Sequence, residues 1–319
     1  MELTIVIPID MRLRGYEILK KIISLTQKAK NQNYNVILGC HAEPFFYTQI
    51  IRNIISKTKN IKIFFSNQKE INLSHLRNIA INQVKTKYIL FMDIDIFINN
   101  QQINQTYLDV TQNSNQLCMY PCLYLSKKGN HYLKKFSLTD YKKAYYDFRR
   151  DLILHLAFPS SIIITDLASV KIINGFDESF VGHGYEDFDF MIRLFHEKKL
   201  IDYQASLMID ETYLAPMMAT GFRAILASTQ LDQLLKNEYF IHIYHKKNKK
   251  SLYHKQRKAN QQHFKRKLNQ RMKENRAIID IAPPYLLKEF YQVLDQQQLK
   301  RSEFSVLWAE IQGHQLRNK

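Results

Sequence analysis

Short apolar runs alternate with helical repeats along the first third of the chain. The β-branched run TIVIP at residues 4–8 predicts a buried strand, and Leu19, Ile22, Ile23 and Thr26 then recur at helical spacing. The alternation continues with strands expected at 36–38, 61–65 and 88–92 and helices at 47–55 and 76–84. Continuous apolar strands separated by helices predict a mostly parallel sheet covered on both faces. Such sheets bind ligands at the carboxyl ends of their strands.

Composition narrows the class of protein. The chain has 319 residues, 45% of them hydrophobic, and a formal net charge of +17, so it can bury a full core and attracts anionic partners. Its three cysteines have neither zinc-site spacing nor an even-numbered disulfide framework. No secretory signal is visible, and no apolar run approaches the roughly 20 residues that span a bilayer. We therefore expect a cytoplasmic enzyme, at most peripheral to a membrane.

The composition changes after residue 245. Residues 246–276 are rich in Lys and Arg with the single acid Glu274, and Pro283 and Pro284 then precede two amphipathic segments. Leu286, Phe290, Val293 and Leu294 mark the first segment, and Phe304, Leu307, Trp308 and Ile311 mark the second. We expect a catalytic domain at 1–245 and a basic, mainly helical extension at 246–319.

Two aspartates, Asp93 and Asp95, follow the strand expected at 88–92 in the sequence YILFMDID. The two-residue period of a strand would place both carboxylates on one face, with Ile94 on the other. Paired acids at a strand end suit a hard divalent cation that also holds diphosphate oxygens. The alternative is that they only solvate the strand end or cap the next helix.

A second group of acids lies in NGFDESFVGHGYEDFDFMIRL at residues 174–194. Gly182 and Gly184 permit a tight loop, which delivers Glu186 and Asp187 together at the start of a helix. Acids in a first turn also favour the helix dipole, so simple capping explains one or two of them. Asp189 and Arg193 are spaced for an ion pair within the helix.

These motifs, in this order, resemble those of inverting, metal-dependent glycosyltransferases of the GT-A fold. The likeness is to family 2 and the related capsule and chondroitin-polymerase enzymes, and it spans roughly residues 3–245. It rests on TIVIP, on NLSHLRNIAINQVKTKYILFMDID and on GFDESFVGHGYEDFDFMIRL, which is similar to the GFDE…GWGxEDxDxxxR segment of those families and of β-1,4-galactosyltransferases.

The resemblance implies a role for each matching residue. Asp187 falls where the base that activates the acceptor sits, and Glu186 where an acceptor hydroxyl is held, with Gly184 and His183 in the same loop. His183 replaces the Trp common in these families. Asp95 would ligate Mn²⁺ or Mg²⁺ directly, and Asp93 would contact the ribose or a metal-bound water. The remaining donor-binding residues would be Pro8, Asp10, Glu43, Arg77 and Asn78.

A third metal ligand, often His in the GT-A fold, would come from YFIHIYHKKNKK. His242 and His245 are three residues apart and cannot share one face of a strand, so we expect only one to reach the metal. His245 is preferred because it lies beside Lys246 and Lys247, which would neutralise a diphosphate. A His satisfied on a strand surface is the alternative for either residue.

The sequence thus predicts transfer of a sugar from a nucleotide-diphospho-sugar, with UDP expected, to a saccharide hydroxyl in bacterial capsule or lipooligosaccharide synthesis. A metal-dependent nucleotidyltransferase would show a Gly-rich basic loop after the first strand, whereas IPIDMRLRG has one glycine. A nucleic-acid-binding protein that uses the basic tail would leave the acids unexplained, so no nucleic-acid partner is expected. The basic segment would hold an anionic membrane surface or acidic polysaccharide, or would only brace the catalytic domain.

Overall fold

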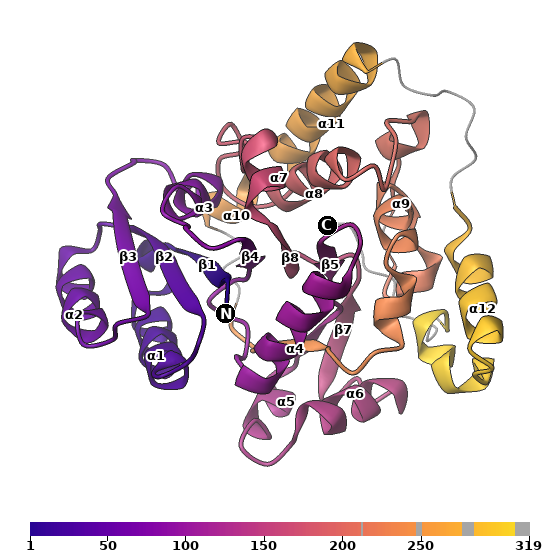
Figure 1. Ribbon diagram of the computed structural model, residues 1–319, viewed down its shortest axis with the longest axis horizontal. Coiled ribbons are helices and arrows are strands. Elements are labelled where there is room, and N and C mark those ends of the chain that lie inside the picture. The colour runs from indigo at the N-terminus through magenta and orange to yellow at the C-terminus, as the bar shows by residue number, and fades with distance from the viewer. Residues whose placement is uncertain (212, 247–250, 276–283, 310–319) are drawn as a thin grey trace. The chain divides into compact units, whose positions relative to one another are not determined.

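A computed structural model describes residues 1–211, 213–246, 251–275 and 284–309 (Figure 1). Contacts divide the chain into two compact units. Unit 1 contains Met1–Cys118, Ile163–Lys198 and Lys247–Arg266, and unit 2 contains Met119–Ile162, Lys199–Lys246 and Lys267–Lys319. This division differs from the boundary expected after residue 245, because the residues described between 251 and 266 pack with the N-terminal elements. The C-terminal basic segment is therefore shared between the units.

Unit 1 is built on a six-stranded sheet in the order β3-β2-β1-β4-β8-β5. Four strands are parallel, and β8 runs antiparallel to β4. The strands are β1 (Leu3–Ile9), β2 (Asn35–His41), β3 (Ile61–Ser66), β4 (Tyr88–Phe91), β5 (Leu117–Met119) and β8 (Ile163–Asp166). The helices between and after them are α1 (Met11–Ala29), α2 (Phe45–Ile55), α3 (Leu73–Ile81), α4 (Asn100–Gln112), α7 (Leu167–Ile172) and α8 (Glu186–Glu197). The predicted α/β fold, a Rossmann-like mostly parallel sheet with flanking helices, is confirmed.

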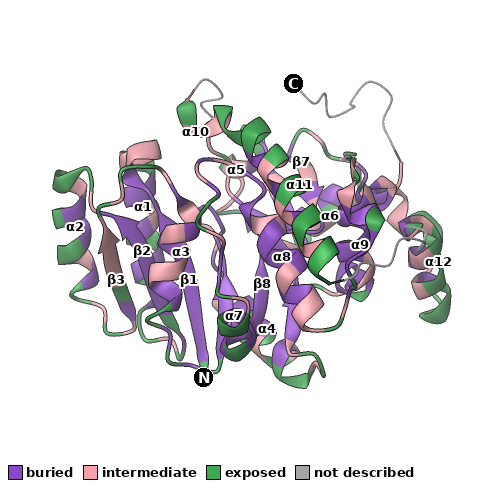
Figure 2. Ribbon diagram, turned by 90° about the horizontal axis from the view of Figure 1, so that it is seen from above, coloured by how far each residue is buried: buried purple, intermediate pink, exposed green. Residues whose placement is uncertain are grey.

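The apolar runs of the central strands explain their position in the sheet. All seven residues of β1 are buried, as are six of the seven in β2, and Figure 2 shows both strands in the colour of buried residues. A strand that is apolar on both faces must be covered on both faces by helices. The sequence of β1 therefore places it in the middle of the sheet, between β2 and β4.

Helix α3 packs closely against the middle of the sheet. Gly39 in β2 faces the backbone of α3, and a Cβ at this position would stand 1.7 Å from the carbonyl oxygen of Leu76. Only a residue without a side chain permits this approach. The glycine consequently fixes the distance of α3, and of Arg77 on it, from the strands.

Unit 2 contains a second sheet that the sequence patterns did not predict. Its order is β11-β6-β7, with β11 (Phe240–His242) parallel and β7 (Ile153–Ala157) antiparallel to β6 (Cys122–Leu125). The other elements of the unit are α5 (Lys127–His131), α6 (Leu138–Tyr146), η1 (Ala205–Met208), β9 (Asp210–Glu211), η2 (Pro216–Met218), β10 (Thr220–Gly221), α9 (Phe222–Ser228) and η3 (Leu231–Leu234). Strands of three to five residues are too short to produce a clear period of two.

The C-terminal segment is helical where it is described. It contains α10 (Leu252–Lys255), α11 (Arg257–Glu274), α12 (Leu286–Gln296) and the 3₁₀ helix η4 (Arg301–Leu307). The ring of Phe290 on α12 lies 5.8 Å from that of Phe304 and 6.4 Å from that of Trp308, centroid to centroid. The two amphipathic segments thus form structure as expected, although Ile311 lies outside the described residues. Within the described part of the chain, every helix is too short or too polar to cross a bilayer.

We expect Gly39→Ala to lower the free energy of unfolding by about 3 kcal/mol, because an inserted methyl group must displace backbone rather than a side chain. Gly15→Ala is the matched control, since its added Cβ would meet only the ring of Tyr47 and alanine favours a helix. Chemical denaturation of both variants measures the difference. Equal stability of the two would show that the approach of α3 does not depend on Gly39.

Candidate active site

One arginine, Arg77 of α3, connects the two acidic motifs within unit 1. Its Nη2 donates to Asp93 Oδ1 at 3.0 Å and lies 3.2 Å from Asp187 Oδ1. Its Nη1 lies 3.7 Å from Glu186 Oε1. The structure therefore brings together four predicted site residues from two motifs that lie far apart in the sequence.

The charges of this cluster do not balance, since three carboxylates surround one guanidinium that is only 3% exposed. Burial opposes the charge on Arg77, but Asp187, Asp93 and Glu186 outweigh it and raise its pKa. Burial also raises the pKa of Glu186 to about 8, with a further contribution from Asp187, and it raises the pKa of Asp93. The cluster is thus strained electrostatically and suited to a cationic or hydrogen-bonding ligand.

Two buried polar atoms of the cluster have no hydrogen-bond partner in the described part of the chain. They are Arg77 Nη1 and Glu186 Oε2. An unsatisfied buried polar group costs about 1–3 kcal/mol, so such groups are retained where a ligand completes them. A donor atom and an acceptor atom that lie close together match a sugar hydroxyl, which both donates and accepts.

The loop before α8 has the backbone geometry that the glycines predicted. Gly182 and Gly184 have φ angles of 81° and 94°, and Tyr185, the N-cap residue immediately before α8, follows with φ of 74°. A left-handed residue immediately before a helix turns the chain sharply. Glu186 and Asp187 consequently enter the cluster from the first turn of α8.

The ion pair predicted between Asp189 and Arg193 is confirmed, with Nε 2.8 Å from Oδ2. It is not a surface pair, because Asp189 is fully buried. Arg193 Nη1 also donates to the carbonyl oxygens of Ile173 and Gly175, at 2.6 and 2.8 Å. The pair therefore fixes α8 to the start of the glycine-containing loop.

Asn78, expected to face the donor nucleotide, forms its hydrogen bonds within the protein. Its Nδ2 donates to the carbonyl oxygen of Phe176 and to Glu178 Oε1, both at 2.8 Å, and its Oδ1 accepts from the Phe176 amide at 2.9 Å. In this position Asn78 joins α3 to the segment that leads to α8. The amide supports Arg77 and the acidic residues by fixing their two helices together.

The two aspartates of the DID motif do not continue the strand, which corrects the strand-face expectation. Strand β4 ends at Phe91, and Asp93 begins a turn in which its carbonyl oxygen accepts from the Ile96 amide at 3.0 Å. The carboxylates consequently have separate partners: Asp93 contacts Arg77, whereas Asp95 pairs with Lys21 and with Arg14, 2.5 Å away. Because of this turn, Asp93 and Asp95 contact different side chains, whereas a continued strand would have placed both carboxylates on one face.

The other predicted donor residues lie in or just after neighbouring strands of unit 1. Pro8 is buried in β1, and the carboxylate of Asp10 caps α1 and pairs with Arg12 at 2.7 Å. Glu43 is exposed in the loop after β2, where its amide donates to His41 Nδ1 at 3.0 Å. Because β2, β1 and β4 are adjacent and parallel, these residues and Asp93 share the carboxyl edge of the sheet.

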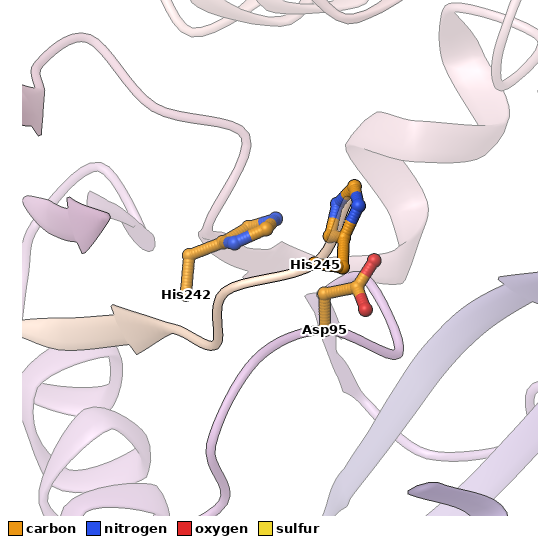
Figure 3. A group of neighbouring side chains, drawn as sticks. All are labelled: Asp95, His242 and His245. Carbon is orange, nitrogen blue, oxygen red and sulfur yellow. The ribbon is translucent and has the colours of Figure 1, made fainter. Parts of the chain in front are cut away.

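Both histidines of the predicted metal segment face a common space in unit 2, which corrects the argument that only one can serve. Strand β11 ends at His242, so His245 lies beyond the strand and the two-residue period does not apply. Their ring centroids are 5.3 Å apart, and His242 also stacks on Tyr124 at 4.2 Å. Figure 3 shows the two imidazole rings, whose nitrogens are ligands of the kind that transition metals bind.

Sequence reasoning missed Tyr253, Arg14 and Lys21. Burial raises the pKa of Tyr253 well above its usual value, and the negative charges of Glu186 and Asp93 add to this effect. Tyr253 belongs to the basic segment, whose described N-terminal part packs on the loop before α8 and so has at least a bracing role. Attachment of this segment to a membrane stays a prediction. No local pattern marked Tyr253, because its neighbours in the cluster lie more than sixty residues away.

Several known proteins are similar to this chain in sequence or in structure. An uncharacterized glycosyltransferase of Haemophilus influenzae is 26% identical over 181 residues, which are 56% of this chain and 68% of that protein. The S. aureus TarS 1–349 structure matches 61% of this chain and 55% of its own, with 14% identity and a TM-score of 0.39. Drosophila β1,4-galactosyltransferase 7 in complex with xylobiose matches 61% of each chain, with 14% identity and a TM-score of 0.33. This chain thus spans a little over half of each of these two solved structures.

The model of one protein family covers most of the chain. It extends over residues 4–270, which include the sheet of unit 1, the DID and ED motifs, both histidines and the segment that carries Tyr253. The resemblance seen in the sequence motifs is thereby confirmed at the level of the family. The chain belongs to the glycosyltransferase-like family 2.

Proposed function

We propose that this glycosyltransferase is an inverting, metal-dependent enzyme that moves a sugar from a nucleotide-diphospho-sugar to a saccharide hydroxyl. UDP is the expected nucleotide, and the product belongs to a bacterial surface polysaccharide such as capsule or lipooligosaccharide. The observation that carries the proposal is the meeting of Asp93, Glu186 and Asp187 at Arg77. A donor site at the sheet edge and an acceptor site at α8 would meet at this cluster.

The donor side of the proposed site follows from charge. A diphosphate is a strong anion, and Arg14 and Lys21 bring two cations to the carboxylate of Asp95. In this proposal Asp10 and Glu43, which follow β1 and β2, together with Pro8 in β1, would contact the ribose and the base.

The metal ligands we propose are Asp95, His242 and His245, with Asp93 contacting the ribose or a metal-bound water. A ligand set of two imidazoles and one carboxylate would favour a transition metal such as Mn²⁺ over Mg²⁺, which prefers oxygen ligands. The bound cation would neutralise charge that develops on the leaving diphosphate. Lys21 and Arg14 would contribute to the same neutralisation and remain paired to Asp95 in its absence.

Asp187 is the proposed base. It is half-buried at the surface of the cluster, and its contact with Arg77 holds it in a fixed position. It would accept the proton of an acceptor hydroxyl as that oxygen attacks the anomeric carbon on the face opposite the diphosphate, which inverts the configuration. Glu186, deeper in the cluster, would hold the same acceptor through its unpaired Oε2.

The donor can be identified by screening nucleotide sugars for hydrolysis in the presence of Mn²⁺ and then offering saccharide acceptors with the preferred donor. Analysis of the product by NMR reports the anomeric configuration. A product that retains the donor's configuration would contradict the single displacement. If the protein instead releases pyrophosphate when given a sugar phosphate and a nucleoside triphosphate, it is a nucleotidyltransferase.

We expect Asp95→Asn to reduce transfer by about 100-fold or more and to abolish Mn²⁺-dependent UDP binding, because the leaving diphosphate loses its compensation. Asp166→Asn is a matched control, since Asp166 is also buried and paired with a lysine, Lys198, but lies opposite Tyr88 at the other end of β4. Titration calorimetry with UDP, with and without Mn²⁺, measures the loss. Normal turnover of the unaltered enzyme in EDTA would remove the metal from the mechanism.

Asp187→Asn should lose transfer by roughly 100-fold or more while it keeps donor affinity, as expected for a positioned general base. Glu186→Gln should instead raise KM for the acceptor, because it alters an atom that holds the acceptor rather than the proton-accepting group. Steady-state kinetics with varied donor and varied acceptor separates the two effects. A collapse of donor affinity in Asp187→Asn would assign Asp187 to the nucleotide site.

A further inference from the structure

The first part of the basic segment forms one wall with the loop before α8, within unit 1. The amide of His183 donates to the carbonyl oxygen of Tyr253 at 3.0 Å, and Asn260 Nδ2 donates to the carbonyl oxygens of Val181 and His183 at 3.1 and 3.3 Å. A Cβ on Gly182 would stand 2.7 Å from Gln256 Cβ. Hydrogen bonds and close packing thus hold α10 and α11 against the residues that lead to Glu186 and Asp187.

Three rings gather at this wall. The ring centroid of His183 lies 5.3 Å from that of Tyr253 and 4.8 Å from that of His254, and the last two lie 5.1 Å apart. All three residues are partly exposed to solvent. Aromatic surfaces of this kind line the sites that bind small ligands, and they suit the apolar face of a sugar. Related enzymes often have Trp at the position of His183, and these three rings would supply an aromatic surface in its place.

Arg257 adds a positive charge next to Gly184 and Tyr185, in the same loop as His183. A Cβ added at Gly184 would stand 2.7 Å from its Nη1. Its guanidinium lies over the ring of Tyr185, 5.2 Å from the ring centroid. The side chain is exposed, and among the described residues no carboxylate lies within ion-pair distance of it. From 251 to 266 the segment carries five basic residues and no acid. The guanidinium is therefore available to an anion that approaches the loop.

The charge of the neighbouring cluster indicates a function for Arg257. Asp187 and Asp93 outnumber Arg77 even when Glu186, whose pKa is raised to about 8, is protonated. An acidic acceptor that approached Asp187 would therefore be repelled at close range. A cation on the acceptor side offsets that repulsion. Arginine is suited to the task because its planar fork binds a carboxylate through two parallel hydrogen bonds.

We propose that the wall of His183, Tyr253 and His254, together with Arg257, is the acceptor subsite and that it takes a saccharide with a uronic acid next to the residue that is extended. The inference deepens the proposed function and rests on it for the identity of the bound partner. The sugar ring stacks on the aromatic side chains, and its carboxylate pairs with Arg257. The C-terminal segment thereby sets acceptor specificity.

The test uses two probes that differ only in charge: an oligosaccharide of alternating hexuronic acid and N-acetylhexosamine, and the same oligosaccharide with its carboxyl groups reduced to alcohols. Calorimetric titration of the whole protein with each probe needs no donor and no turnover. We expect the acidic probe to bind at least tenfold more tightly. Arg257→Gln should remove this preference, as the loss of one bidentate pair predicts.

Lys258→Gln is the matched control, because Lys258 is adjacent, exposed and of the same charge but belongs to neither the rings nor the loop. We expect its preference for the acidic probe to match that of the unaltered protein within twofold. An equal loss in Lys258→Gln and Arg257→Gln would show general charge attraction and overturn the subsite. Equal binding of both probes by the unaltered protein would also overturn it.

The aromatic part is tested with Tyr253→Phe and Tyr253→Leu, each checked for an unchanged melting temperature. The phenylalanine variant should bind the acidic probe within about threefold of the unaltered protein, whereas the leucine variant should lose at least tenfold, because only the former keeps the ring. Equal affinity in both variants would remove stacking from the proposal. Donor hydrolysis by the unaltered enzyme is a separate measurement: its absence would contradict the proposed function, while the binding results would still decide the subsite.

Discussion

The buried charge of Arg77 is the constraint on which unit 1 depends. A guanidinium that is 3% exposed costs several kcal/mol unless carboxylates compensate it, and here they come from the turn after β4 and the first turn of α8. Helix α3, that turn and α8 must therefore come together for the chain to fold. Gly39 sets how closely α3 approaches the sheet, and Asn78 ties it to the segment before α8. The interactions that stabilise the fold thus also assemble the site.

In the proposed mechanism, one group of acids would serve two substrates. One arginine faces Asp93 and Asp187 as well as Glu186, whose pKa is raised to about 8, so its positive charge does not fully compensate the acids. On the sheet side, Arg14 and Lys21 bring positive charge to Asp95, next to the position proposed for the diphosphate. On the helix side, the unpaired Glu186 Oε2 offers a hydrogen-bond acceptor to a hydroxyl. Differences in local charge can thereby keep donor and acceptor apart in one small region.

The C-terminal basic segment changes in meaning once its contacts are known. As a sequence it is a run of lysines and arginines, which indicates general attraction to anions. In the structure its first part contributes backbone and side-chain hydrogen bonds to the loop that carries His183. A segment far along the chain therefore completes a wall beside the ED motif, and the position of Arg257 distinguishes it from the other basic residues around it.

The sequence alone determined the α/β order, the covering of the sheet on both faces and the pairing of acids with glycines, because continuous apolar strands and tight turns depend on neighbouring residues. It could not determine which side chains meet across the fold. The two-residue period failed for Asp93 and Asp95, since β4 ends at Phe91, and again for His242 and His245, since β11 ends between them. Only the tertiary structure decided that Arg77 joins both acidic motifs, that Asn78 is a structural link and that Tyr253 lies against the ED loop. Each of these depends on contacts between distant segments, which a local pattern does not encode.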